Sequence, residues 1–159
     1  MIQYAAGDAT RPVGDGPKVI VHICNEVGGW GAGFVVAISK RWPEPEAAYR
    51  RWHKGMGDVP FALGEVQFVE VEPSLWVANM IAQRNVVAAG GLPPVRYEAV
   101  ESALTKVAQF ANERDATVHM PRIGCGLAGG KWEEIERIVQ STLVDRGIDV
   151  TVYDLKASH

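Results

Sequence analysis

Short apolar segments alternate with segments of helical periodicity along the chain, and this alternation limits the possible folds more than any other feature. Apolar residues recur three and four positions apart over 95–112 and 131–147, which predicts helices, and shorter helices are predicted at 33–42 and 43–53. Strands are predicted at 2–6, 18–24, 65–71, 75–82, 117–123 and 149–155. The turn at 72–74 joins two of them in an antiparallel hairpin. We therefore expect an α/β fold, a three-layer α/β/α domain with a central mixed sheet of about six strands.

The composition is that of an ordinary globular domain. With 47% apolar and 22% charged residues, the 159-residue chain can bury one core, so we expect a single domain over residues 1–159. A net charge of −3 argues against direct nucleic-acid binding, and no apolar run has the length of a membrane span. Without a leader pattern, we expect a cytoplasmic protein, with a monomer favoured. Cys24 and Cys125 have neither metal-ligand spacing nor a disulfide framework, so we expect no metal and no cofactor.

Two glycine-rich segments each stand between a predicted strand and a predicted helix. They are CNEVGGWGAG at 24–33 and GCGLAGG at 124–130. Glycine permits positive φ, so successive N–H groups can turn toward one point beside a helix N-terminus and bind a diphosphate without a lysine. One such loop is as often only a tight turn, but two at the same edge of a sheet favour a ligand site. Neither matches the Walker motif or the dinucleotide motif G-x-G-x-x-G.

Four motifs follow one another along the chain: GD at 7–8, GWGAGF at 29–34, IAQRN at 81–85 and PRIGCGL at 121–127. Together they resemble the macro domain family of ADP-ribose-binding proteins. The resemblance covers nearly the whole chain. It is strongest to the branch with the terminal ADP-ribose protein glycohydrolase and the macro domain of a poly-ADP-ribose-dependent chromatin remodeller. It implies that the partners are ADP-ribose and ADP-ribosylated proteins.

The resemblance also implies roles for individual residues. Asp8 would accept a hydrogen bond from the adenine amino group, although an aspartate after glycine is also typical of a turn. Asn25 and the loop that follows it would hold the distal ribose, and the second glycine loop would wrap the diphosphate. The expected ligand-binding residues are Asp8, Ala9, Asn25, Gly31, Ala32, Gly33, Phe34, Gln83, Arg122, Ile123, Gly124, Cys125, Gly126, Leu127 and Ala128.

The chain departs from the glycohydrolase at two positions that matter for its chemistry. Gln83 and Ala128 stand where the resemblance implies an attacking lysine and an aspartate, and neither residue can do that chemistry. We therefore expect hydrolysis of mono-ADP-ribose esters of Asp and Glu side chains, whose carboxylate leaves readily. The catalytic residues would be Asn25, Glu26 and Arg84, with Glu26 orienting water and Arg84 stabilising the departing carboxylate. A solvent-facing loop carboxylate is an equally good interpretation of Glu26.

Two other functions remain open at this point. A non-catalytic ADP-ribose reader needs only the ligand site, and an ADP-ribose 1″-phosphate phosphatase would use the same site with phosphate as the leaving group. Because no effector region accompanies the domain in this sequence, we expect the enzyme rather than the reader.

Other polar side chains are expected to be structural. His22 and Cys24 share one face of a strand, but an i, i+2 pair rarely brings sulfur within hydrogen-bond reach of imidazole, so we expect a buried structural cysteine. His119 is expected within the sheet rather than as a base. For Cys125, we expect the backbone to be the useful part.

Overall fold

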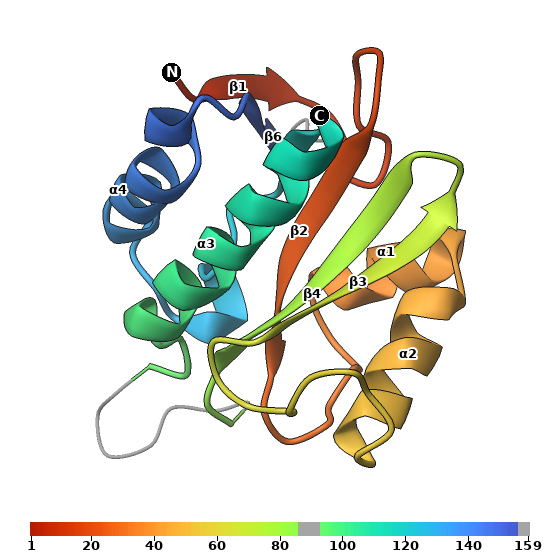
Figure 1. Ribbon diagram of the computed structural model, residues 1–159. Coiled ribbons are helices and arrows are strands. Elements are labelled where there is room, and N and C mark those ends of the chain that lie inside the picture. Colours follow the sequence, from red (N-terminus) through yellow and green to blue (C-terminus); the bar gives the residue numbers. More distant parts are fainter. Residues whose placement is uncertain (86–92, 156–159) are drawn as a thin grey trace.

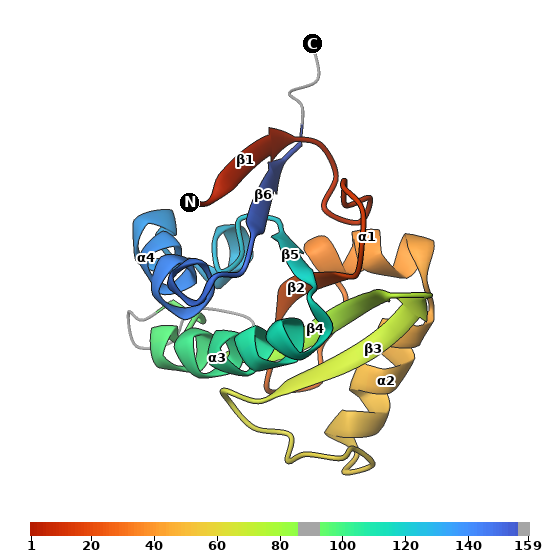
Figure 2. The same ribbon diagram turned by 45° about the horizontal axis from the view of Figure 1, so that its top comes forward.

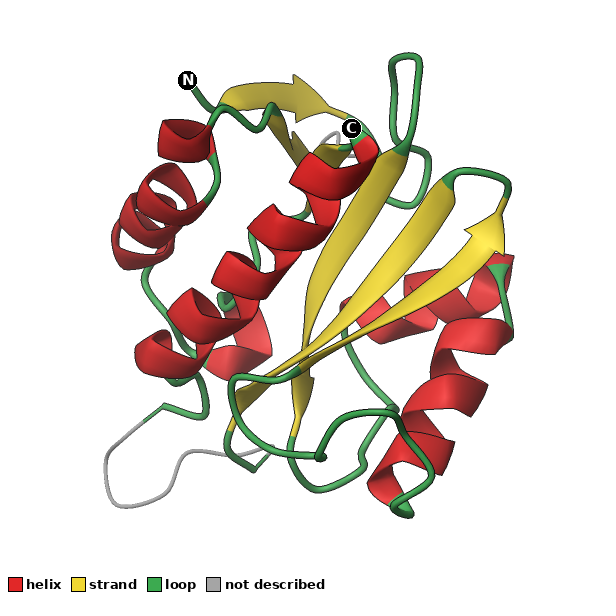
Figure 3. Cartoon of the chain, in the orientation of Figure 1, coloured by secondary structure: helices red, strands yellow, loops and turns green. Residues whose placement is uncertain are grey.

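The structure, a computed structural model, describes residues 1–85 and 93–155 (Figure 1). The helices are α1 (Phe34–Arg41), α2 (Glu44–His53), α3 (Tyr97–Arg114) and α4 (Trp132–Thr142), with 3₁₀ turns η1 (Gly126–Ala128) and η2 (Val144–Arg146). The strands are β1 (Gln3–Ala6), β2 (Lys18–Asn25), β3 (Val66–Glu72), β4 (Leu75–Gln83), β5 (Thr117–Met120) and β6 (Val150–Asp154) (Figure 3). The sequence RNVVAAGGLPP at 84–94 predicts an irregular loop, of which residues 86–92 lie outside the described residues.

These strands form one sheet in the order β1-β6-β5-β2-β4-β3. Neighbouring strands run parallel except β3, which pairs antiparallel with β4 across the predicted turn at 72–74. The sheet is therefore mixed, and β4 lies inside it, as expected for a continuously apolar strand. Because the other strands run parallel with β4, their carboxyl ends meet at one edge of the sheet.

Helices cover both faces of the sheet (Figure 2). Helices α3 and α4 pack on one face and α1 and α2 on the other, which confirms the three-layer α/β/α fold. Side chains along β2 point alternately to the two faces of the sheet. Val19 and Val21 pack in the core under α3 and α4, and Ile20 and Cys24 pack in the core under α1 and α2. None of the helices described in the structure has the length and apolarity needed to cross a bilayer.

Helix α3 begins two residues later than its periodicity predicts. The apolar stripe predicts a helix over 95–112, but Val95 forms an isolated antiparallel bridge with Gln83. The backbone there pairs with the end of β4, so the helix runs over Tyr97–Arg114 instead. Asp115, in the left-handed conformation with φ 52°, ends it.

Strand β5 and helix α4 are both shorter than predicted. The strand expected at 117–123 ends at Met120, because Pro121 has no N–H to donate to the ladder. The helix expected at 131–147 ends at Thr142, whose hydroxyl donates to the carbonyl four residues earlier at 2.6 Å and so competes with continued helix. Gly147, expected to end this helix, instead ends η2 with φ 82°.

The apolar periodicity over 131–147 predicts a buried helix face made of Trp132, Ile135, Val139 and Leu143, and the structure confirms this face with one exception. Ile135, Val139 and Leu143 are fully buried. Trp132, in the first turn of the helix, packs against this core but is only half-buried. Its indole N–H donates to the Tyr4 hydroxyl at 3.1 Å, so this polar atom is satisfied at the surface.

Candidate functional site

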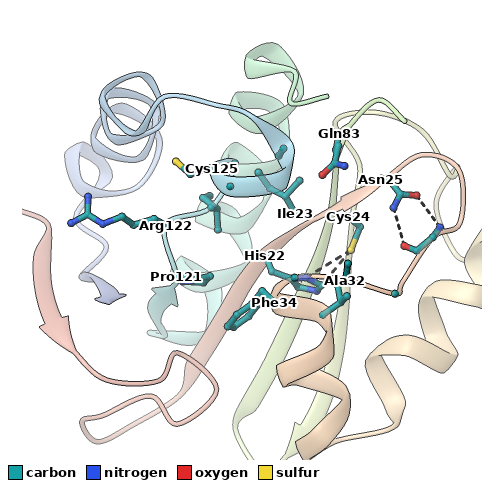
Figure 4. Close-up of a pocket in the computed structure, with 18 residues that line it drawn as sticks. His22, Ile23, Cys24, Asn25, Ala32, Phe34, Gln83, Pro121, Arg122 and Cys125 are labelled. Atoms are coloured by element: carbon teal, nitrogen blue, oxygen red, sulfur yellow. Dashed lines mark hydrogen bonds between the residues drawn. The ribbon is translucent and has the colours of Figure 1, made fainter. Parts of the chain in front are cut away.

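A cavity of about 640 Å³ opens at the edge of the sheet where the parallel strands end (Figure 4). Sites for small-molecule ligands have volumes of roughly 300–1,000 Å³. Both glycine loops, the first turn of α1 and the end of β4 contribute to its wall. The lining residues are His22, Ile23, Cys24, Asn25, Gly29, Gly31, Ala32, Gly33, Phe34, Val35, Gln83, Pro121, Arg122, Ile123, Gly124, Cys125, Gly126 and Ala128.

The loop after β2 is shaped by the side chain of Asn25. Its Oδ1 accepts hydrogen bonds from the Val27 and Gly29 N–H groups at 3.0 and 2.9 Å, and its Nδ2 donates to the Gly29 carbonyl at 2.9 Å. The Tyr49 hydroxyl, from α2, donates to the Asn25 carbonyl at 2.6 Å and lies 3.0 Å from Oδ1. Asn25 therefore folds the loop as well as lining the cavity (Figure 4).

The loop after β5 is shaped by its own backbone. Gly124 and Gly126 have φ angles of 78° and 67°, in the region that favours glycine. The Gly130 N–H donates to the Gly124 carbonyl at 2.6 Å, and a Cβ on Gly130 would lie 2.3 Å from that oxygen. The Val95 N–H also donates to the Ala128 carbonyl at 3.0 Å. This tight folding requires the glycines and keeps the backbone of the loop in the cavity wall.

The cavity suits a negatively charged ligand. None of the described lining residues carries a carboxylate. The start of α1 forms part of the wall, and the unpaired N–H groups of a helix N-terminus favour an anion. Arg122 lines the cavity, but its side chain extends away from the other labelled residues (Figure 4) and pairs with Asp154 at 2.7 and 3.0 Å. Backbone N–H groups are thus the main donors available to a diphosphate.

A histidine and a cysteine lie side by side in the floor of the cavity. Burial lowers the pKa of His22 to about 4, and its Nε2 lies 2.6 Å from Asn79 Oδ1. Cys24 Sγ lies 3.8 and 4.0 Å from the two ring nitrogens, nearer than expected for such a pair, and burial raises the pKa of this thiol. A neutral imidazole beside a neutral thiol does not make a thiolate nucleophile. The prediction of a buried cysteine is confirmed.

Asp8 and Ala9 are not among the described residues that line this cavity. Asp8 follows β1 at the same edge and lines a neighbouring hollow that shares Gly33 with the cavity. Its Oδ1 accepts hydrogen bonds from the Thr10 N–H at 2.8 Å and the Thr10 hydroxyl at 2.7 Å, which is the turn geometry named above as an alternative. Among the described residues, none donates a hydrogen bond to Asp8 Oδ2. That oxygen can still accept from a ligand.

Glu26 and Arg84 are also not among the described residues that line the cavity, but their side chains lie beside each other. Arg84 Nε is 4.0 Å from Glu26 Oε1, and the side chains are 64% and 31% exposed, respectively. The Glu26 N–H donates to the carbonyl of Gln83, a lining residue, at 3.0 Å. The pair therefore lies next to the cavity rather than inside it. Leu127 is part of η1, within the second glycine loop.

His119 lies away from the cavity, within the sheet as expected. Its Nε2 is 2.7 Å from Thr117 Oγ1 and its Nδ1 is 2.7 Å from the Tyr153 hydroxyl, which accepts from the Val13 N–H at 3.0 Å. Burial lowers the pKa of His119 to about 4. This chain of hydrogen bonds ties the segment after β1, which carries Asp8, to β5 and β6.

Sequence reasoning missed two buried residues that support the site. Asn79 orients His22, while its Nδ2 donates to the Pro45 carbonyl and to Gln67 Oε1, both at 3.1 Å. An amide inside a continuously apolar strand is a usable signal, because buried amides need partners. Tyr49 lies in a helix-permissive segment that gives no such signal.

The fold and cavity define an α/β/α domain with a pair of glycine-rich loops at the ends of parallel strands. Among solved structures, the chain is 57% identical to a protein of unknown function from Bacteroides thetaiotaomicron (TM-score 0.94, covering 98% of each chain). It is 54% identical to a macrodomain protein from Streptomyces coelicolor (TM-score 0.86, covering 98% of this chain and 100% of that one). No family model matches the chain. The similarity to the Streptomyces protein over its full length shows that the chain belongs to the macrodomain family.

Curated relatives carry names from ADP-ribose biology and chromatin. The chain is 32% identical to chromodomain-helicase-DNA-binding protein 1-like of Danio rerio, covering 96% of this chain. It spans only 15% of that relative's length and 17% of the length of the Mus musculus counterpart. An ADP-ribose 1″-phosphate phosphatase of Candida albicans is 26% identical, covering 88% of this chain and 92% of the relative. A DNA ADP-ribosyl glycohydrolase of Mycobacterium tuberculosis is 25% identical, and the match covers 96% of this chain and 42% of the relative.

Proposed function

We propose that this chain binds ADP-ribose in the cavity and hydrolyses the ester that links mono-ADP-ribose to Asp and Glu side chains of modified proteins. The main support is that two glycine loops and the start of α1 converge on one cavity whose described lining has no carboxylate. A diphosphate between the loops would accept hydrogen bonds from backbone N–H groups. Membership of the macrodomain family supports the same ligand.

The ligand would lie with its adenine toward Asp8 and its distal ribose toward Asn25. Asp8 retains an oxygen that can accept from the adenine amino group, and the Asp8 hollow and the cavity share Gly33 in their walls. The Asn25 loop forms the wall at the other end. The ligand would thus run across the start of α1, where the diphosphate meets the helix N-terminus.

The proposed chemistry needs no covalent intermediate. Water adds to the anomeric carbon of the distal ribose as the bond to the carboxylate oxygen breaks, which gives ADP-ribose and a free side-chain carboxylate, and the proton goes to solvent. Asn25 would shape the ribose end of the cavity. Arg84, at the rim, would stabilise the charge that develops on the departing carboxylate. Glu26, 4.0 Å away, would orient this guanidinium and a water beside it.

The test is incubation with glutamate-linked ADP-ribosylated protein, with released ADP-ribose measured and ADP-ribose affinity determined separately by calorimetry. Release by the wild type, and much slower release from a serine-linked substrate, is the expected result. Tight binding without release would instead support a reader. Release of phosphate from ADP-ribose 1″-phosphate alone would support the phosphatase activity named for the Candida relative. Absence of both binding and release would contradict the assignment altogether.

A further inference from the structure

We propose that Tyr49 is a positioning residue: it sets the shape of the Asn25–Gly29 turn and so determines how the cavity receives the distal ribose. Tyr49 is not among the described residues that line the cavity and acts through Asn25. This role rests on the proposed binding of ADP-ribose with its distal ribose beside Asn25.

The hydrogen bond between Tyr49 and Asn25 lies where the pairing of β2 becomes irregular. The pairing of β2 with β4 shifts register between Cys24 and Asn25. Just there, the Tyr49 hydroxyl lies 2.6 Å from the Asn25 carbonyl oxygen and 3.0 Å from Asn25 Oδ1. Both residues are buried, with Tyr49 0% exposed. Removal of this hydroxyl would leave the buried Asn25 carbonyl without its hydrogen-bond donor. The turn would have to move for this carbonyl to find another donor.

Helix α2 also holds the turn at a second point. His53 lies one helical turn after Tyr49 and packs against Gly28, whose φ is 84°. A Cβ on Gly28 would lie 2.6 Å from His53 Nδ1. The Tyr49 ring is also 5.3 Å from the ring of Trp30, at the far end of the loop. One face of α2 therefore fixes the loop along its length.

The other parts of the ligand site depend on different elements. The second glycine loop, at 124–130, follows β5. The segment after β1, which carries Asp8, is tied to β5 and β6 through Tyr153. A change at Tyr49 should consequently affect a ligand that carries the distal ribose and spare one that lacks it. ADP is the matched probe, because it shares the adenosine and the diphosphate of ADP-ribose.

The experiment is calorimetric titration of ADP-ribose and ADP into the wild type and three variants. Tyr49→Phe should weaken ADP-ribose binding about 10-fold, as expected for a lost buried hydrogen bond, and leave ADP within about 2-fold. Gly28→Ala should produce the same selective loss by forcing the turn away from His53. Tyr153→Phe removes a buried hydroxyl from the other end of the site, so any loss should be equal for the two ligands.

Each outcome is decisive. Equal ADP-ribose affinity in Tyr49→Phe and wild type, or an equal loss for both ligands, would overturn the positioning role. A wild type that binds ADP-ribose no better than ADP would count against the proposed function instead. Thermal unfolding checks that Tyr49→Phe is folded. If it is not, Gly28→Ala decides: unchanged preference for ADP-ribose over ADP in a folded Gly28→Ala protein overturns the role.

Discussion

The two loops that form the walls of the cavity are built in different ways. In the loop after β2, the Asn25 side-chain amide makes three hydrogen bonds to the backbone of the turn, and the Tyr49 hydroxyl from α2 contacts both the carbonyl and the amide oxygen of Asn25. In the loop after β5, backbone bonds and positive φ angles at glycines do the same work. The first loop should therefore be sensitive to the removal of side chains, and the second to their addition.

The largest effect is expected from acid, which acts through two buried histidines: His22 in the floor of the cavity and His119 within the sheet. Burial holds the pKa values of His22 and His119 at about 4 in the folded protein, against 6.5 for a free imidazole. The unfolded chain therefore takes up protons first. Stability should be full above pH 6.5 and should fall as the pH drops toward 4, by up to the order of 3 kcal/mol per histidine.

Chemical denaturation at several pH values measures this effect. His22→Gln and His119→Gln should each flatten the loss of stability between pH 6.5 and 4. A wild-type stability that stays constant over this window would show that the two imidazoles are not buried as described.

Addition of a side chain to the second loop should nearly abolish binding. Gly126→Glu would place a carboxylate beside the proposed diphosphate, and we expect at least a ~100-fold loss of ADP-ribose affinity from charge repulsion and obstruction. A Cβ on Gly126 has nothing within 4 Å, so the fold should survive.

Gly126→Ala is the matched control for the change in backbone preference. At φ 67°, it should cost roughly 1 kcal/mol of stability and leave most of the affinity. Retained affinity in a folded Gly126→Glu protein would remove the second loop from the site.

Removal of a side chain should affect the first loop more than the second. Asn25→Ala leaves the Val27 and Gly29 N–H groups without their acceptor, so we expect a loss on the order of 10-fold in ADP-ribose affinity and about 2 kcal/mol in stability. Cys125→Ala, in the second loop, should change affinity by less than about 2-fold, because its thiol makes no hydrogen bond among the described residues. Similar losses in both variants would refute the contrast between the loops.

The smallest effect is expected at the rim. Arg84→Ala should lower turnover of a glutamate-linked substrate several-fold, roughly 3- to 10-fold, and leave ADP-ribose affinity unchanged, because only interactions stronger in the transition state speed the chemical step. Glu26→Gln should act in the same direction. The effect is limited because the two charged groups are 4.0 Å apart and the Arg84 side chain is 64% exposed to solvent. Unchanged turnover in both variants would remove this pair from catalysis.

The fold was predictable because its signals are local. Alternating apolar residues in 65–71 and the continuous apolar run in 75–82 mark a hairpin, and the order of strands and helices leaves few three-layer arrangements. The start of α3 was predicted wrongly because it depends on non-local pairing. No local pattern near Val95 shows that its backbone bridges to Gln83.

The candidate site was predictable where it is made of backbone. Glycine-rich segments between a strand and a helix leave a visible pattern in the sequence, and Gly33 and Gly124, both with positive φ, line the cavity. Side chains that act through others leave little pattern. Tyr49 and Asn25 lie 24 positions apart in the sequence and meet only when α2 packs against the end of β2.

The most direct test of the account is a crystal structure of the protein with bound ADP-ribose. We predict a diphosphate held by backbone N–H groups between the loop Gly31–Gly33 and the loop Gly124–Gly126, with the adenine at Asp8 and the distal ribose against the Asn25–Gly29 turn. ADP-ribose bound elsewhere, or bound here with its ends reversed, would contradict the central claim that the two glycine loops bind the diphosphate and the Asn25–Gly29 turn receives the distal ribose.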